Sequence, residues 1–357
     1  MQAQDSTRST TALPMFGPGR HLLGVSQFDR EGLDRLFELA DLVRPIAERR
    51  SVCTVLDGAV LGSLFFEPST RTRLSFESAF LRLGGEVTTT TGFTFSSMAK
   101  GESIEDTSRV VSGYSDVLVV RHPDEGSVAQ FASSSVVPVI NAGDGAGEHP
   151  SQALLDTYTL IRELGARGRD LDGCTIAIVG DLRYGRTVHS LMKLLSVADN
   201  ITFRLFSPPS LDLPVAITDH VRARGNQVVH ADSVVEAVAE ADVVYATRVQ
   251  RERMTEELHS TVRGNLLNRS MLEQAGVDQD IIIMHPLPRD SRHDSYDLAA
   301  DVDDLPGLAI FDQTDNGLLV RMAIFLTTLG CSADSVRATL KQRPWKADLD
   351  WPGGTPA

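Results

Sequence analysis

The 357-residue sequence has only three cysteines, no block of lysine or arginine, and no apolar run near the roughly 20 residues that span a bilayer. Its cysteines are widely separated and odd in number, which fits neither a disulfide framework nor a zinc site with paired ligands. Acidic residues outnumber basic ones by 48 to 34, so a face for nucleic acid is not expected. The first 20 residues lack the apolar core of a signal peptide. These absences predict a cytoplasmic protein that binds neither nucleic acid nor membrane.

A chain of this length can form two domains, each with its own core, and two domains create a cleft. Apolar, β-branched runs of strand length alternate with helix-like segments twice along the chain. The alternation predicts an α/β protein with two open parallel sheets, each flanked by helices. The predicted strands of the first sheet are 60–66, 86–90, 116–120 and 136–141, and those of the second are 174–179, 201–206, 227–230, 242–246 and 281–284.

Helical spacing of apolar residues predicts helices over 29–44, 72–83, 104–113, 149–163 and 315–330. The helix after His149 is expected to join the domains, and the last helix to cross back over the cleft. The expected limits are a flexible tail over 1–18, a first domain over 19–148, an inter-domain helix over 149–164, a second domain over 165–312, a returning helix over 313–342, and a tail over 343–357.

The most informative string closes the first predicted strand and opens a helix: Phe65-Phe66-Glu67-Pro68-Ser69-Thr70-Arg71-Thr72-Arg73. Hydroxyls and a guanidinium at a helix start combine free backbone N–H groups, the positive end of the helix dipole and a bidentate clamp. Helix capping alone accounts for Ser69 or Thr70. It leaves unexplained the arginines in the first turn, where the dipole disfavours cations. The string therefore predicts a phosphate site.

Most other polar motifs follow a predicted strand, and open parallel sheets bind ligands at the carboxyl ends of their strands. Arg121 ends one strand, although a surface arginine is common there. His149 and Gln152 share the first turn of the helix after a Gly-rich turn, where a capping histidine is the alternative. The segment 92–102 carries Ser96 and Lys100; alone it is a mobile polar loop, but beside an anion site it can close over a phosphate.

Three further strings have ordinary alternatives. Gly180 to Thr187 has the spacing of a P-loop, but Arg186 stands where the lysine belongs, and no magnesium-binding Asp or catalytic base can be singled out. Alternation after the strand 242–246 would point Arg248 and Gln250 the same way. An ordinary charged surface segment is the alternative interpretation of this string. In His285-Pro286-Leu287-Pro288 the prolines remove donors and leave carbonyls available to a substrate amide. A turn without a functional role is the alternative interpretation.

Together these strings resemble the aspartate and ornithine carbamoyltransferase family, and most closely its aspartate-specific catalytic chains, from about His21 to Gly330. The resemblance rests on Phe-Glu-Pro-Ser-Thr-Arg-Thr-Arg, His149-Pro150-Ser151-Gln152, Gly180-Asp181-Leu182 running through Tyr184-Gly185-Arg186-Thr187 to His189-Ser190-Leu191, Arg248-Val249-Gln250, and His285-Pro286-Leu287-Pro288. It assigns carbamoyl phosphate to the domain over 19–148 and aspartate to the domain over 165–312. The implied reaction joins these substrates into N-carbamoyl-L-aspartate and phosphate, the first committed step of pyrimidine synthesis.

The resemblance also implies residue roles. Ser69, Thr70, Arg71 and Thr72 hold the phosphate, and Ser96 and Lys100 close over it from a neighbouring subunit. Thr72, Arg121 and His149 polarise the carbonyl, while Gln152 and the carbonyls of Pro286 and Leu287 bind the carbamoyl NH₂. Arg186, Arg248, Gln250 and Lys100 bind aspartate. Arg71, Thr72, Lys100, Arg121 and His149 form the catalytic group, with no protein nucleophile, cofactor or metal.

Two alternatives stay open on the sequence. The segment 290–297 is longer than the family's usual short acidic one, which leaves room for a different amino-acid acceptor. A catalytically silent subunit is disfavoured because His149 and every expected cation are present. A site shared through Ser96 and Lys100 implies at least a homotrimer, and a regulatory chain or a dihydroorotase stays open as a further partner.

Overall fold

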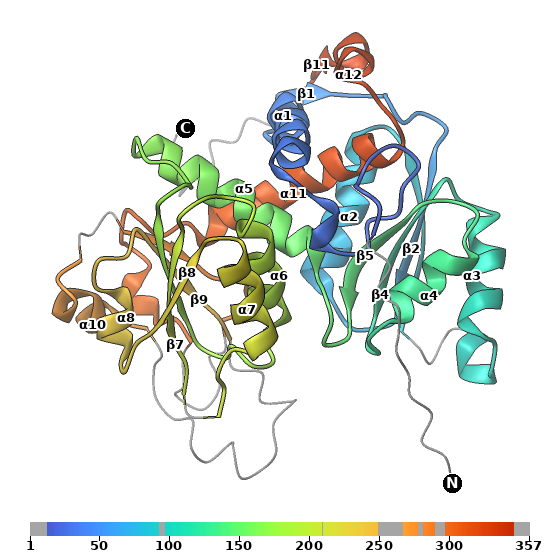
Figure 1. The fold of residues 1–357 in the computed structure, drawn as a ribbon. Helices are drawn as coiled ribbons and strands as arrows, with labels where there is room; N and C mark the ends of the chain where they lie inside the picture. The colour runs from blue at the N-terminus through green and yellow to red at the C-terminus, as the bar shows by residue number, and fades with distance from the viewer. Residues whose placement is uncertain are drawn as a thin grey trace, which may run out of the picture.

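The computed structural model describes residues 13–92, 97–208, 210–248, 267–277, 281–289 and 297–345. Two α/β units lie beside each other, and helices α5 (Pro150–Ala166) and α11 (Ile310–Thr328) run between them (Figure 1). Both sheets are parallel throughout. The α/β class with two open parallel sheets, predicted from the alternation of apolar runs, is confirmed.

The first sheet has the strand order β3-β2-β4-β5. Its strands are β2 (Val60–Phe65), β3 (Glu86–Thr91), β4 (Val117–His122) and β5 (Val139–Asp144), and its helices are α1 (Arg30–Ala47), α2 (Thr70–Arg82), α3 (Ile104–Ser112) and α4 (Ser127–Ser134). The chain runs outward from β2 to β3 and then returns to the other side of β2 with β4. The strand order therefore reverses between β2 and β4.

The second sheet has the order β10-β9-β6-β7-β8, with its reversal between β6 and β9. Its strands are β6 (Thr175–Val179), β7 (Thr202–Phe206), β8 (Gln227–His230), β9 (Val243–Ala246) and β10 (Ile282–Met284). Its helices are α6 (Arg186–Leu195), α7 (Val215–Ala223), α8 (Val234–Val238) and α10 (Arg269–Gln274). Short 3-10 helices lie at η1 (Val25–Gln27), η3 (Ser97–Lys100) and η6 (Ala300–Val302).

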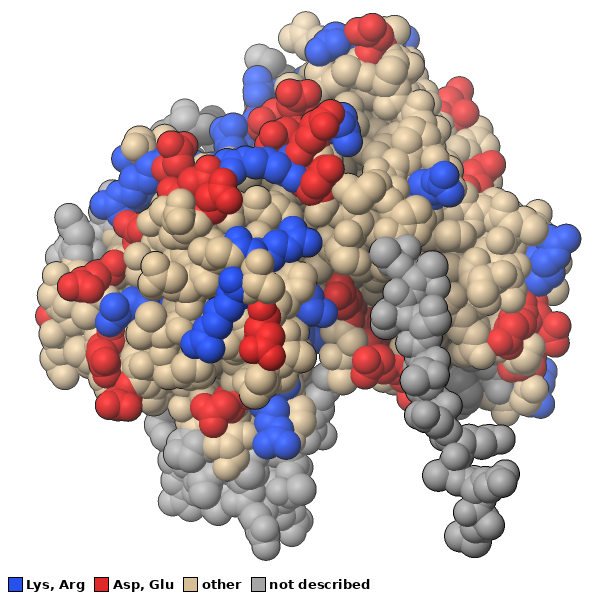
Figure 2. Space-filling model, viewed as in Figure 1, with Lys and Arg blue, Asp and Glu red and all other residues tan. Residues whose placement is uncertain are grey.

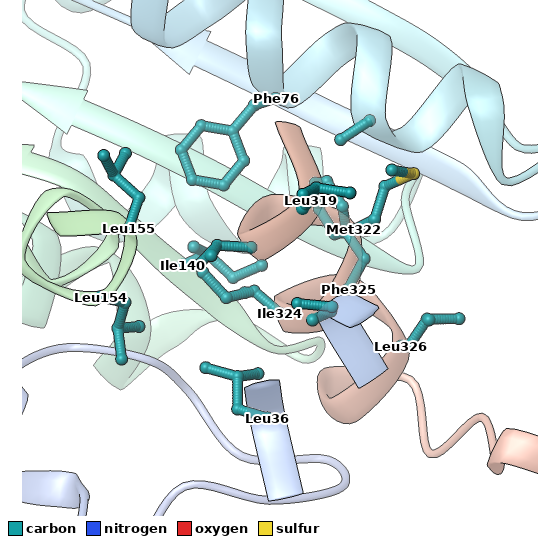
Figure 3. Close-up of a cluster of buried hydrophobic side chains, with 14 of the residues drawn as sticks. Leu36, Phe76, Ile140, Leu154, Leu155, Leu319, Met322, Ile324, Phe325 and Leu326 are labelled. Carbon is teal, nitrogen blue, oxygen red and sulfur yellow. The ribbon is translucent and has the colours of Figure 1, made fainter. Parts of the chain in front are cut away.

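The largest apolar core lies where α1, α2, α5 and α11 meet. Figure 3 shows Phe76 of α2, Leu155 of α5 and Phe325 of α11 in this cluster. The Phe325 ring packs edge-on against Phe76 and Phe80, at centroid distances of 5.8 and 4.9 Å. Helix α2, whose first turn carries the predicted phosphate motif, is thus held against α11 by buried aromatic rings further along the helix.

Two ends of helices differ from the sequence-based expectation. Helix α1 continues through Pro45 to Ala47, whereas the pattern predicted an end at Arg44. Pro45 cannot donate to the Asp41 carbonyl, but buried Ile46 and the bond from the Glu48 N–H to the Arg44 carbonyl at 3.0 Å hold the last turn. Helix α11 begins at Ile310, five residues before the predicted start. Its first turn is buried at Ile310 and Gln313, and burial extends the helix beyond the most apolar stretch.

Both ends of the described chain pack on the first unit. The Phe16 ring lies 5.3 Å from Phe28, and the Phe16 backbone N–H donates to the Gln27 carbonyl at 2.9 Å. This contact differs from the tail expected over 1–18, because an aromatic ring provides the apolar area that the surrounding composition lacks. After α12 (Ala333–Thr339), β11 (Lys341–Gln342) pairs antiparallel with β1 (Ser51–Val52). The predicted domain limits stay predictions.

On the face in Figure 2, acidic and basic side chains are interspersed. No single helix of the described residues is long and apolar enough to cross a membrane; α11 and α12 meet that test only as a pair bent by 114°.

Candidate active site

The two reversals of strand order point to one place. Arg71 and Arg186 lie in the first turns of α2 and α6, the helices that follow β2 and β6, whereas Arg121 lies near the carboxyl end of β4 and Arg248 just beyond that of β9. Ligands of open parallel sheets bind in the crevice where the strand order reverses. These four arginines line one cavity of about 440 Å³ between the two units. The topology alone therefore brings together motifs that are up to 177 residues apart in the sequence.

The cavity contains most of the residues predicted for the site. These are Ser69, Thr70, Arg71, Thr72, Arg121, His149, Gln152, Arg186, Arg248, Pro286 and Leu287. Its volume lies within the usual range for small-molecule sites, roughly 300 to 1,000 Å³. The cavity also contains groups to which the sequence analysis gave no role: Glu67, Ser75, Leu155, Thr187, Thr247, His285, Gln313, Thr314 and Arg321.

Helix α2 opens with an unfilled donor set. Ser69 is the N-cap residue, with extended backbone, but its side chain makes no capping hydrogen bond within the described structure. The first N–H groups of a helix have no partner inside the helix, so those of residues 70–72 are open to an anion at this end. A Ser that merely capped the helix would satisfy one of them itself. The geometry therefore favours anion binding over capping.

Positive charge concentrates in this cavity. Arg71 is open to solvent, but partial desolvation lowers its pKa, and repulsion from Arg121 and Arg248 lowers it further. Arg186 is almost completely buried, which is costly for a charge unless it is paired. Like charges held this close favour any anion that enters between them.

Glu67 partly neutralises these cations. Its Oε2 accepts a hydrogen bond from Arg121 Nε at 3.0 Å and lies 3.4 Å from Arg186 Nη2. Glu67 stands beside the phosphate motif in the sequence, but its contacts reach residues 54 and 119 positions away. In the sequence, only charge balance could have indicated this role of Glu67, since clustered arginines need a nearby carboxylate.

The Gly-rich turn before α5 packs against two of the guanidinium groups that line the cavity. Gly143 has a φ of +129°, and a Cβ there would lie 3.2 Å from Arg186 Nη2 and 3.4 Å from Arg121 Nη1. The same turn supplies acceptors: Arg186 Nη1 donates to the Gly145 carbonyl, and Arg121 Nη1 to the Ala142 carbonyl at 3.4 Å. Glycine at 143 thus allows two guanidinium groups to pack against backbone.

His149 is a buried, neutral imidazole. Burial lowers its pKa well below 6.5, and the nearby Arg186, Arg121 and Arg321 lower it further. Its Nδ1 lies 3.4 Å from Ser151 Oγ, and its backbone N–H donates to Ser190 Oγ at 3.2 Å. A neutral imidazole at this position can donate one N–H to a substrate carbonyl without adding to the positive charge of the cavity.

The loop after β10 is held by its own side chains. The Leu287 backbone N–H donates to His285 Nδ1 at 2.9 Å, and the His285 N–H donates to Gln313 Oε1 at 3.0 Å. Leu287 has a φ of +55°, a left-handed conformation that is strained for a leucine. This conformation presents Pro286 and Leu287 along the wall of the cavity.

Not every predicted residue reaches the cavity. Lys100 ends η3, is exposed, and is absent from the described lining of the cavity of its own chain. Ser96, Gln250 and most of the longer segment, 290–296, lie outside the described residues. Within the described ranges, no group of three or more His, Cys, Asp or Glu residues could hold a metal ion.

The fold and the site define a two-domain α/β protein with an anion-binding cleft. Residues 20–162 match the family model for the carbamoyl-P binding domain of aspartate/ornithine carbamoyltransferases, and residues 172–328 match that for the Asp/Orn binding domain. The chain therefore belongs to the aspartate/ornithine carbamoyltransferase family, as the motifs predicted.

Relatives make the comparison more specific. The chain is 53% identical over 312 residues to an aspartate carbamoyltransferase catalytic subunit from Dichelobacter nodosus, covering 87% of this chain and 90% of the relative. It is 49% identical over 333 residues to the corresponding subunit from Cellvibrio japonicus, covering 93% and 98%. A solved aspartate transcarbamoylase from Trypanosoma cruzi, in complex with carbamoyl aspartate and phosphate, is 36% identical with a TM-score of 0.79, covering 89% and 99%.

Proposed function

We propose that this chain transfers the carbamoyl group of carbamoyl phosphate to the amino group of L-aspartate, giving N-carbamoyl-L-aspartate and phosphate, a step of pyrimidine synthesis. The observation that carries the proposal is the cavity between the two sheets, where the open end of α2 and the side chains of Arg71, Arg121, Arg186 and Arg248 converge. A dianionic phosphate and a dicarboxylate need that density of donors. The named relatives and their ligand complexes support the same reaction.

The phosphate would bind at the start of α2, to Ser69, Thr70, Arg71 and Thr72. Thr72, Arg121 and His149 would then donate to the carbamoyl oxygen. The aspartate amine attacks the carbonyl carbon, and the C=O electron pair moves to that oxygen, where these donors stabilise the negative charge. When the intermediate collapses, the C–O bond to phosphate breaks, phosphate leaves with the electron pair, and the amine proton passes to phosphate or water.

Gln152 and the carbonyls of Pro286 and Leu287 would hold the carbamoyl NH₂ and orient the carbon for attack. Arg186 and Arg248 would bind the two carboxylates of aspartate, together with Gln250 and Lys100. Ornithine carries a second amine, which needs a carboxylate partner, and the arginines of the cavity repel it. This chemistry requires no metal, cofactor or protein nucleophile.

We further infer a cytoplasmic homotrimer in which Ser96 and Lys100 complete the site of a neighbouring subunit. The position of Lys100 supports this, because it is exposed and lies outside the cavity lined by its own chain. The free thiols of Cys53, Cys174 and Cys331 support a reducing compartment. A regulatory chain or a dihydroorotase remains a candidate partner of that trimer.

The test is a comparison of acceptors. The purified chain is incubated with carbamoyl phosphate and with aspartate, ornithine, putrescine or 2,3-diaminopropionate, and the ureido product is measured by colour reaction. We expect the highest kcat/KM for aspartate. A higher value for another acceptor would assign the chain to a different carbamoyltransferase reaction, and no product with any acceptor would reject the proposal.

A further inference from the structure

A fully buried carboxyl group lies directly behind the cavity. Asp156, on α5, is 0% exposed, and its Oδ1 accepts from Gln152 Nε2 at 2.9 Å and from Gln313 Nε2 at 2.6 Å. Its Oδ2 accepts from the Tyr245 hydroxyl at 2.7 Å. These donors come from α5, α11 and β9. One carboxylate therefore joins the second sheet to both helices that run between the units.

The two amides bonded to Asp156 are held in one orientation. An amide that donates through Nε2 to a carboxylate presents its Oε1 on the other side as an acceptor. For Gln313, this Oε1 accepts from the His285 backbone N–H at 3.0 Å, at the start of the loop that carries Pro286 and Leu287. A flipped Gln313 would place its NH₂ against the His285 N–H and its oxygen against Asp156, leaving buried donors unpaired.

The same orientation matters at Gln152, which is half-buried and lines the cavity. With Nε2 bonded to Asp156, its Oε1 is the atom that can accept from a carbamoyl NH₂. A flipped Gln152 would offer donors to a group that itself donates. The acceptors expected around the carbamoyl NH₂, namely Gln152 Oε1 and the carbonyls of Pro286 and Leu287, thus depend on one buried oxygen.

Asp156 also faces a buried positive charge. Arg321, on α11, is nearly fully buried, and burial lowers its pKa to about 10, with Asp156 as the opposing charge. Burial raises the pKa of Asp156 to about 7, against the hydrogen bonds from Gln313, Tyr245 and Gln152, which lower it. Three donors aimed at one carboxyl fit its ionised form, since a protonated oxygen would have to displace one of them.

Resting on the proposed function, we propose that Asp156 is a positioning residue for the carbamoyl group: its Oδ1 fixes the amides of Gln152 and Gln313 so that the site presents acceptors, and not donors, to the carbamoyl NH₂. Asp156 does not touch substrate. It acts through the two amides, so its removal should affect the carbamoyl end of carbamoyl phosphate and spare the phosphate end.

Two substitutions separate the acceptor from the charge. In Asp156→Asn, the amide oxygen can occupy the Oδ1 position and keep both glutamine bonds, while its NH₂ donates to the Tyr245 hydroxyl oxygen. In Asp156→Leu, the acceptor is lost at similar volume. We expect kcat/KM for carbamoyl phosphate to fall by about tenfold to a hundredfold in Asp156→Leu, the scale of a misplaced reacting group, and by only about threefold in Asp156→Asn.

Inhibition by inorganic phosphate distinguishes a positioning role of Asp156 from a merely structural one. A structural role would weaken the binding of phosphate and of carbamoyl phosphate alike. Phosphate has no NH₂, so its inhibition constant in Asp156→Leu should stay within about threefold of wild type, a change below 1 kcal/mol. The matched control is Thr159→Val, one turn further along α5. Thr159 is equally buried and accepts from Asn316 Nδ2 of α11 at 3.1 Å, so this variant breaks an α5–α11 bond that touches neither glutamine.

The outcomes distinguish the two proposals. An inactive wild-type chain would reject the proposed function and this inference with it. An active wild type with an unchanged Asp156→Leu would reject only the role of Asp156. So would equal weakening of phosphate and carbamoyl phosphate, or equal losses in Thr159→Val. If Asp156→Leu does not fold, Gln313→Met is compared with Asn316→Leu on α11; the same selective loss is expected in Gln313→Met only, and its absence overturns the inference.

Discussion

At the scale of single residues, Arg71 offers the most direct test of the anion site. It is exposed at the start of α2, and Arg121 and Arg248 repel it, so it adds little to the stability of the unliganded chain. A charge-assisted contact to phosphate is worth roughly 2 to 3 kcal/mol. We therefore expect Arg71→Ala to raise the KM for carbamoyl phosphate by about 30-fold to 150-fold, with an unchanged unfolding midpoint in urea.

Arg73 provides the matched control for Arg71. It lies two residues further along α2, 3.6 Å from Glu77, and is not among the described residues that line the cavity. Arg73→Ala removes the same kind of side chain from the same helix, so its KM should stay within about twofold, the effect of an ordinary surface change. A near-normal KM in a folded Arg71→Ala protein would place the phosphate elsewhere.

His149 makes a second residue-scale prediction, which concerns pH. Its pKa is lowered by folding, so below about 6.5 the unfolded chain binds a proton that the folded chain does not. Stability should then fall as pH falls, by up to about 1.4 kcal/mol per pH unit from this one group. We expect the free energies of unfolding of wild type and His149→Gln to converge between pH 6.5 and 5 at equal protein concentration. Parallel curves would show that folding does not lower the pKa of His149.

What the sequence reveals at this scale depends on distance along the chain. Ser69 to Thr72 are consecutive, so their joint role can be predicted from one string. Glu67 and Gln313 act on partners that only folding brings near. Asp156 left a weak local signal, since it is an acid four residues after Gln152 and directly after the apolar run Ala153-Leu154-Leu155. A buried acid on a helix needs partners, and only the tertiary structure names them.

At the scale of elements, α11 sets the position of both α2 and Asp156. Phe325 fills the contact with α2, and deleting a buried aromatic ring costs about 3 to 5 kcal/mol. We expect Phe325→Ala to lower the free energy of unfolding by that amount in a urea titration. Phe311, 61% exposed on the same helix, is the control, and Phe311→Ala should change stability by about 0.5 kcal/mol or less. Equal losses would contradict the packing argument, and helix propensity could not explain them because alanine forms helices better than phenylalanine.

Apolar runs predict which elements exist better than where they end. All nine strands predicted for the two sheets are present. The inner strands are apolar along their length because they are buried, whereas the edge strands β3 and β8 are mostly exposed. The ends shift by tertiary contacts: β4 extends to His122, and β5 to Asp144, where their backbone groups pair beyond the apolar runs. The paired strands β1 and β11, two residues each, carry no such run and were not predicted.

At the scale of the whole molecule, a chain with a net charge of −14 places Arg71, Arg121, Arg186, Arg248 and Arg321 around one cleft. The acidic surface repels anions at long range, so selectivity for them rests on the arginines between the two sheets. The strand order that creates this cleft was not predicted, although the placement of motifs at strand ends was. Which strands lie side by side depends on crossovers that no local pattern encodes.

The proposed sharing of a site between subunits can be tested by mixing two variants of the chain. If Lys100 completes the site of a neighbouring subunit, Lys100→Ala and Arg71→Ala each spoil a different half of a composite site. Assayed at a carbamoyl phosphate concentration near the wild-type KM, each variant alone should be almost inactive. Refolded together into mixed trimers, about a quarter of the sites would combine an intact Arg71 from one chain with an intact Lys100 from the next.

We therefore expect activity to return on co-refolding, to about a quarter of the wild-type value per site at equal mixing. A site built within one chain cannot recover in this way, because every chain in the mixture carries one lesion. Size-exclusion chromatography verifies the trimer, and a mixture of the two variants that was never unfolded serves as the control for exchange. Verified mixed trimers without activity would reject the shared site. The exposed Lys100 would then be a surface residue, and the arginines of a single cavity would have to bind both substrates without help from a second chain.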